Sequence, residues 1–83
     1  MASRFKDLQL SPAEWEEREG DALFYLNDLQ TALRLYEAAL TSASEPFSIW
    51  LKLSDVHFML GNLEKEKIFR EKIYGSLTDK ESP

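Results

Sequence analysis

The chain contains no cysteine, three glycines, three prolines and one histidine among 83 residues. The lack of cysteine excludes disulfides and thiolate metal sites, although it leaves the redox compartment open. No apolar run approaches membrane-spanning length or resembles the hydrophobic region of a signal peptide, so we expect a cytoplasmic protein. Basic residues are a minority, ten against fifteen acidic ones, which gives a formal net charge of −5. An acidic chain lacks the electrostatic footprint of nucleic-acid binding and is disfavoured at anionic membranes.

Groups that carry enzyme chemistry are equally scarce. His57 is the only histidine and lies in the most apolar stretch, where a core or groove position is favoured over a catalytic one. The carboxylates of residues 15–21 lack the glycine and oxygen spacing of a calcium loop, and a solvated helix face explains them better. No glycine-rich phosphate loop is present. We therefore expect no catalytic residue, no metal site, no cofactor and no enzyme activity.

The remaining composition is that of one small globular domain. Hydrophobic residues make up 43% of the chain and charged residues 30%, which is the balance of a folded soluble protein. Apolar residues recur at helical spacing in four segments. Ser11, Pro12 and Glu14 form the pattern of a capping box with proline in the first turn, so a helix should begin at Pro12. The predicted helices cover residues 12–26, 29–43, 46–60 and 63–74, with turns at 27–28 and 61–62.

These elements predict an all-α fold of two antiparallel helix-turn-helix hairpins stacked as a short array. Residues 1–11 should form an N-terminal arm, and residues 12–75 the helical domain. Gly75 is expected to stop the last helix. Residues 76–83 are mostly polar, so we expect a disordered C-terminal tail.

The two hairpins share a period of 34 residues, which is the length of the tetratricopeptide repeat. At this spacing the chain pairs Asp21 with Asp55, Phe24 with Phe58, Leu26 with Leu60, Leu29 with Leu63 and Glu37 with Glu71. Small and aromatic residues also fall where that family has them: Gly20, Ala32, Tyr36 and Ala39, then Trp50, Leu53 and Ser54. Residues 12–75 therefore resemble the tetratricopeptide repeat family, in which small residues allow close helix crossings.

The second hairpin departs from the family pattern. Glu66 stands where the family has alanine, and Arg70 stands where it has an aromatic residue. Both fall in the stripe made by Leu63, Phe69 and Ile73, and their spacing of four allows an ion pair. A looser last helix with a solvated pair is favoured over a specific partner contact, and burial of the pair stays open.

The resemblance implies that the first helix of each hairpin lines a concave binding groove. Some relatives hold an acidic peptide there with basic residues, whereas this chain has acidic ones at the corresponding positions. Acidic residues beside apolar ones suit a basic amphipathic helix instead. The residues expected to bind the partner are Glu17, Asp21, Phe24, Tyr25, Leu51, Asp55, Phe58 and Met59. For Phe24 and Phe58, a position in the core is an equal alternative.

Two functions follow from these expectations. The first is a protein-interaction module, an adaptor or small chaperone that binds an amphipathic, basic helix of a client. The second is a structural assembly unit that homo-oligomerises or docks as a subunit of a larger complex. Both predict exposed apolar side chains. The third helix is apolar nearly all round and only one helix follows it, so Leu51, Phe58 or Met59 should remain partly exposed.

Overall fold

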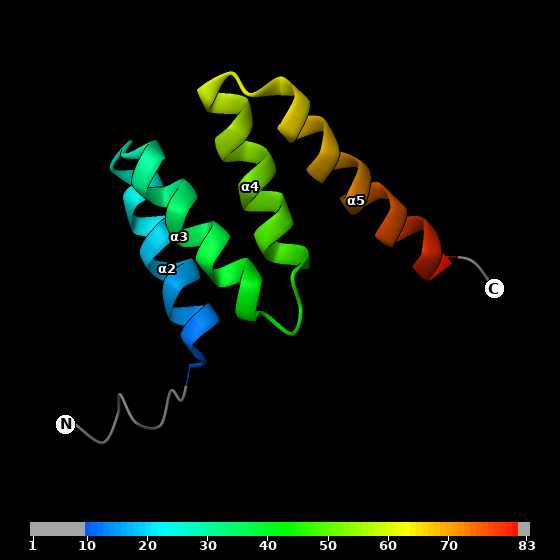
Figure 1. Cartoon of the computed structure of the whole chain (residues 1–83). Helices are drawn as coiled ribbons and strands as arrows, with labels where there is room; N and C mark the ends of the chain where they lie inside the picture. Colours follow the sequence, from blue (N-terminus) through cyan, green and yellow to red (C-terminus); the bar gives the residue numbers. More distant parts are fainter. Residues whose placement is uncertain (1–9, 82–83) are drawn as a thin grey trace.

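The computed structural model describes residues 10–81, and these fold into four α-helices with no strand (Figure 1). The helices are α2 (Pro12–Tyr25), α3 (Leu29–Ser42), α4 (Phe47–Leu60) and α5 (Leu63–Glu81). Helix α2 packs on α3 and α4 packs on α5, while contacts between α3 and α4 stack the two hairpins. The predicted all-α fold of two stacked hairpins is confirmed. The predicted N-terminal arm lies outside the described residues except for its last two positions, 10 and 11.

The start of α2 forms the capping box that its sequence predicts. The Ser11 side chain accepts a hydrogen bond from the Glu14 amide at 3.2 Å, and the Glu14 carboxylate accepts one from the Ser11 amide at 2.9 Å. The second bond favours the charged carboxylate, so the pKa of Glu14 is lowered. At the start of α3, Asp28 accepts a hydrogen bond from the Thr31 amide at 3.3 Å. These side chains satisfy amides that the first helical turn leaves without partners.

The two hairpin turns have the same backbone hydrogen bonds, 34 residues apart. In the first turn, the Asn27 amide donates to the Phe24 carbonyl at 2.9 Å and the Asp28 amide to the Leu23 carbonyl at 2.8 Å. In the second turn, the amides of residues 61 and 62 donate to the carbonyls of residues 58 and 57 at 3.1 and 2.8 Å. The residue at the centre is left-handed in both, Asn27 at φ 68° and Gly61 at φ 81°. This is the pairing by which a left-handed residue ends a helix.

The main core lies where α2, α3 and α4 meet. Its members are Ala13, Ala32, Tyr36, Ala39, Ile49, Leu53 and Val56, all of them buried. Gly20 is buried against the Tyr36 ring so closely that a Cβ atom at Gly20 would lie 2.7 Å from Tyr36 Cε1. Only glycine leaves room for the ring at this point, so the separation of α2 and α3 is set by this contact.

His57 joins the two helices of the second hairpin. Its ring is buried and stacks on Phe69 of α5, with ring centroids 5.8 Å apart and planes at 7°. The His57 Nδ1 atom lies 3.3 Å from the Asn62 side-chain nitrogen. Burial lowers the pKa of His57, and the nearby Lys65 charge adds to this effect. The imidazole is therefore a neutral part of the packing between α4 and α5.

The end of α5 differs from the prediction. The helix does not stop at Gly75 but continues to Glu81, so the expected disorder is wrong for residues 76–81. Residues 82–83 lie outside the described part of the chain. Gly75 ends a helix only by adopting a left-handed conformation, and it does not do so here. Its penalty inside a helix is about 1 kcal/mol, which packing of the buried Ile73 and the half-buried Ser76 can offset.

The charged pair of α5 is formed, with its two members in different surroundings. The Arg70 Nε atom lies 3.4 Å from Glu66 Oε2, and the Ser54 hydroxyl of α4 donates to the same oxygen at 3.4 Å. The Glu66 side chain is 14% exposed, whereas that of Arg70 is 51% exposed. Glu66 is therefore largely buried between α4 and α5, with a partner from each helix, and Arg70 keeps its contact with water. This arrangement avoids an unpaired buried charge.

Replacing each of the two helical glycines by alanine should change the free energy of unfolding in opposite directions. Gly20→Ala should lower the free energy of unfolding by about 1–3 kcal/mol, because the methyl group would overlap the Tyr36 ring. Gly75→Ala should raise it by about 0.5–1 kcal/mol, because nothing lies within 4 Å of the added atom and alanine favours helix. Urea denaturation followed by circular dichroism measures both. A silent Gly20→Ala would show that the ring does not lie under Gly20, and a destabilising Gly75→Ala would contradict a helix through that position.

Candidate partner-binding groove

A groove lies between α2 and α4 and contains two hollows. The first has a volume of about 330 Å³ and is lined by Ser11, Ala13, Glu14, Glu17, Ala43, Ser44, Glu45, Ser48 and Ile49. The second has a volume of about 240 Å³ and is lined by Asp21, Phe24, Tyr25, Tyr36, Lys52 and Asp55. We call the two together the α2–α4 groove, and the second one the aromatic hollow. Most of the lining belongs to the first helices of the hairpins, where the sequence predicts a binding surface, and the rest comes from Ser11, from Tyr36 of α3 and from residues 43–45.

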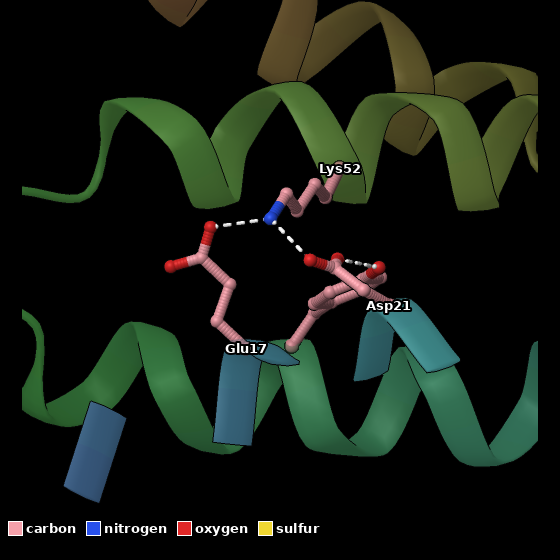
Figure 2. Close-up of polar contacts among 4 residues, drawn as sticks. Glu17, Asp21 and Lys52 are labelled. Atoms are coloured by element: carbon pink, nitrogen blue, oxygen red, sulfur yellow. Dashed lines mark hydrogen bonds and ion pairs between the residues drawn. The ribbon is translucent and has the colours of Figure 1, made fainter. Parts of the chain in front are cut away.

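A network of polar contacts holds the walls of the groove together. Lys52 of α4 reaches across to α2, where its ammonium lies 2.6 Å from Glu17 Oε2 and 2.8 Å from Asp21 Oδ2 (Figure 2). The other Asp21 oxygen accepts a hydrogen bond from the Tyr36 hydroxyl of α3 at 2.6 Å. One carboxylate therefore links three helices. The Lys52–Asp21 contact spans 31 residues of sequence.

The protonation states follow from this geometry. Burial raises the pKa of Tyr36, and the hydrogen bond to the Asp21 carboxylate raises it further, so its hydroxyl stays protonated as the donor. Partial burial acts to lower the pKa of Lys52, but the two carboxylates outweigh it and the pKa is raised on balance. Lys52 is thus a charged clamp between α2 and α4.

Four of the eight predicted binding residues come together in the aromatic hollow: Asp21, Phe24, Tyr25 and Asp55. Glu17 lines the neighbouring hollow instead. Leu51, Phe58 and Met59 lie on α4 outside both hollows and are 44%, 64% and 54% exposed, so the expected exposure of this helix is confirmed. The alternative for the two phenylalanines also has an answer. Phe24 is half-buried and packs on the core, whereas Phe58 is exposed.

Sequence reasoning did not include Lys52 and Tyr36 in the site. These two residues bind Glu17 and Asp21, which are two of the acidic residues that were expected to bind a partner. Asp55 differs from these: within the described part of the chain it forms neither a hydrogen bond nor an ion pair. One signal was available in the sequence, because Lys52 is the only lysine or arginine between residues 47 and 60.

The groove carries a negative charge in spite of the clamp. Among the described residues, five carboxylates and one ammonium line its two hollows: those of Glu14, Glu17, Asp21, Glu45, Asp55 and Lys52. The positive charge of Arg18 helps to lower the pKa of Glu14, but Arg18 lines neither hollow. Such a surface attracts cationic groups and repels anionic ones.

Comparison with protein-family models, curated proteins and solved structures gives no match for this chain. Within residues 10–81, no helix combines the length and the apolar character needed to cross a membrane. The same residues contain no group of three histidine, aspartate or glutamate side chains placed to hold a metal ion. The interpretation of the groove therefore depends on its own geometry and chemistry.

Removing the clamp should weaken the fold. Lys52→Met should lower the free energy of unfolding by about 0.5–1 kcal/mol, because Glu17 and Asp21 then face each other without a cation. The difference from wild type should shrink in concentrated salt, which screens the partly exposed charges. Urea denaturation at low and high salt measures both effects. Lys67→Met is the matched control, since Lys67 is exposed on α5 and has no ion pair within the described residues. Equal effects of the two substitutions would contradict the clamp.

Proposed function

We propose that this chain is a protein-interaction module, an adaptor or small chaperone that binds a basic amphipathic helix of a client protein in the α2–α4 groove. The observation that carries the proposal is the combination of uncovered apolar side chains with an acidic groove on the first helices of both hairpins. The apolar side chains suit the apolar face of such a helix, and the acidic groove suits its basic face.

The apolar half lies on α4 and at the end of α2. Phe58, Met59 and Leu51 are exposed on α4, and Tyr25 of α2 is 91% exposed. Tyr25 and Asp55 line the same hollow, and Leu51, Phe58 and Met59 each lie three or four positions from Asp55 on α4, so these apolar residues adjoin the groove. Large exposed apolar side chains next to a groove are typical of surfaces that bind the apolar face of a helix.

The carboxylates of the groove determine the sign of the charge that a ligand should carry. Among the residues that the structure describes, Lys52 is the only cationic side chain that lines the two hollows, and its ammonium is already bound to two carboxylates. The described lining therefore offers no free cation to hold an acidic peptide. The surplus of carboxylates favours lysine and arginine on the polar face of the ligand.

The repeat character of the chain supports the same function. The two turns share their hydrogen bonds at an offset of 34 residues, and Gly20, Ala32 and Ala39 are buried where the resemblance to tetratricopeptide repeats places small residues. If the chain is a member of that family, the α2–α4 groove corresponds to its concave binding face. Membership is a proposal that rests on these residues alone.

A second function, assembly with another copy or a larger complex, is favoured by a different surface. Helix α5 packs on α4, and it carries four exposed apolar residues: Leu63, Ile68, Tyr74 and Leu77. Arrays of repeats need their terminal faces covered. Light scattering over a range of concentrations distinguishes the two functions, because assembly through α5 predicts a concentration-dependent mass and client binding does not.

The binding proposal predicts that a charged residue in the apolar part of the surface weakens the binding of a helix. The probe is a fluorescent, designed amphipathic helix of leucine and lysine, followed by anisotropy. Phe58→Asp should weaken its binding about tenfold or more, because exposed aromatic side chains are common anchors of such contacts. Ile68→Asp, the same kind of change on exposed α5, should leave binding unchanged.

Two further measurements make this test strict. A matched helix of leucine and glutamate should not bind, and circular dichroism should show that both variants remain as helical as the wild type. The proposed function is wrong if the leucine–lysine helix does not bind the wild type, or if Phe58→Asp and Ile68→Asp bind it equally well.

A further inference from the structure

The aromatic hollow has the size of a site for one side chain. Its volume of about 240 Å³ lies below the roughly 300–1,000 Å³ of pockets that enclose whole small-molecule ligands. Phe24 and Tyr25 line it from α2, Tyr36 from α3, and Asp55 from α4. Because Tyr25 is almost fully exposed and Tyr36 is buried, the hollow is open on the Tyr25 side and closed at Tyr36.

The charges that line the hollow leave one carboxylate available. Asp21 uses one oxygen for the Tyr36 hydroxyl and the other for the Lys52 ammonium, at 2.6 and 2.8 Å. Lys52 is engaged in turn by Glu17 and Asp21. Asp55 has no such partner within residues 10–81, yet it lies near enough to Tyr36 for its charge to contribute to the raised pKa of that residue. The hollow therefore presents aromatic rings and one uncompensated negative charge.

Among anionic, apolar and cationic side chains, the cationic one matches this lining best. An anionic group would be repelled by Asp55 and Asp21. A neutral apolar group would contact the aromatic residues but gain nothing from the Asp55 carboxylate, which is exposed to water. A cation on an apolar stem places the stem against the rings and the charge beside Asp55, and aromatic faces also attract cations directly.

We propose that the aromatic hollow receives one lysine or arginine side chain of the client helix, with Asp55 as its counter-ion and Phe24 and Tyr25 as the surface for its stem. This inference rests on the proposed function, and it assigns that function a specificity-determining contact. Lys52 does not occupy the position itself, because its ammonium is directed to Glu17 and Asp21. The chain's own lysine thus pairs with the two neighbouring carboxylates and leaves Asp55 for the ligand.

The test uses small probes that carry only the proposed group: n-butylammonium for lysine, n-butylguanidinium for arginine, and n-butanol and butyrate as neutral and anionic controls. Each is titrated into the full chain while the Tyr25 ring and Asp55 amide signals are followed by nuclear magnetic resonance. We expect a saturable shift of both signals with at least one cation, and none with butanol or butyrate at the same concentrations. The arm that saturates first identifies the preferred side chain.

Variants separate a specific contact from general attraction to an acidic protein. Asp55→Asn should raise the dissociation constant of the cation about fivefold, and Tyr25→Ala should raise it by a similar factor. Glu71→Gln removes the same charge from an exposed position on α5 and should change nothing. The inference is overturned if cations shift signals throughout the chain, or if Asp55→Asn and Glu71→Gln bind them equally.

The outcomes for this inference and for the proposed function are distinct. If the leucine–lysine helix binds and Phe58→Asp weakens binding, but no butyl cation shifts the Tyr25 and Asp55 signals, the groove function stands and the side-chain contact is wrong. If a butyl cation binds through Asp55 but no helix does, the cation site stands and its assignment to a client helix is overturned.

Discussion

The contact between Tyr36 and α2 is the constraint on which the rest of the structure depends. The Tyr36 ring lies against Gly20, which brings α2 and α3 together, and its hydroxyl holds one oxygen of Asp21. The other Asp21 oxygen binds Lys52, which attaches α4 to the same point. Burial of the ring supplies the apolar part of the interaction. The hydrogen bond to Asp21 satisfies the hydroxyl, which would otherwise be a buried donor without a partner. A single tyrosine thereby fixes the position of both first helices, and with them the groove.

The same network determines which charges a ligand can meet. Lys52 satisfies Glu17 and Asp21, so these residues support the walls of the groove, whereas Asp55 remains without an ion pair in the described chain. The groove is therefore acidic, but its carboxylates are not equivalent, because some are paired and others are free in the part of the chain that the structure describes. In a small protein, one residue can serve both the fold and the binding surface, and Asp21 does so here.

Features that depend on residues close in the sequence could be predicted. The capping box at Ser11 and Glu14 and the turn at Gly61 follow from local hydrogen bonding, and the structure has both. The 34-residue period correctly indicated that the two turns are alike, although the first has Asn27 where the second has glycine. Helical spacing also identified α4 as a helix with apolar residues left uncovered.

Features that depend on tertiary contacts could not be predicted from the sequence. Gly75 is a common terminator, but whether it takes a left-handed conformation depends on how the neighbouring residues pack, and here α5 continues. The spacing of Glu66 and Arg70 indicated that they could pair, but not that Ser54 of α4 donates to the same Glu66 oxygen and leaves Glu66 largely buried. Likewise, the pairing of Lys52 with Asp21 joins residues 31 positions apart on different hairpins, and although Lys52 is the only lysine or arginine between residues 47 and 60, the sequence does not indicate its partners.

The coupling between Tyr36 and Lys52 through Asp21 tests this account most directly. It is measured by a double-mutant cycle of Tyr36→Phe and Lys52→Met in urea denaturation, where phenylalanine keeps the ring against Gly20 and removes only the hydroxyl. If both residues act on one carboxylate that joins three helices, their effects on the free energy of unfolding should be non-additive by about 0.5 kcal/mol or more. Additivity within about 0.3 kcal/mol would contradict it, because the two contacts would then be independent.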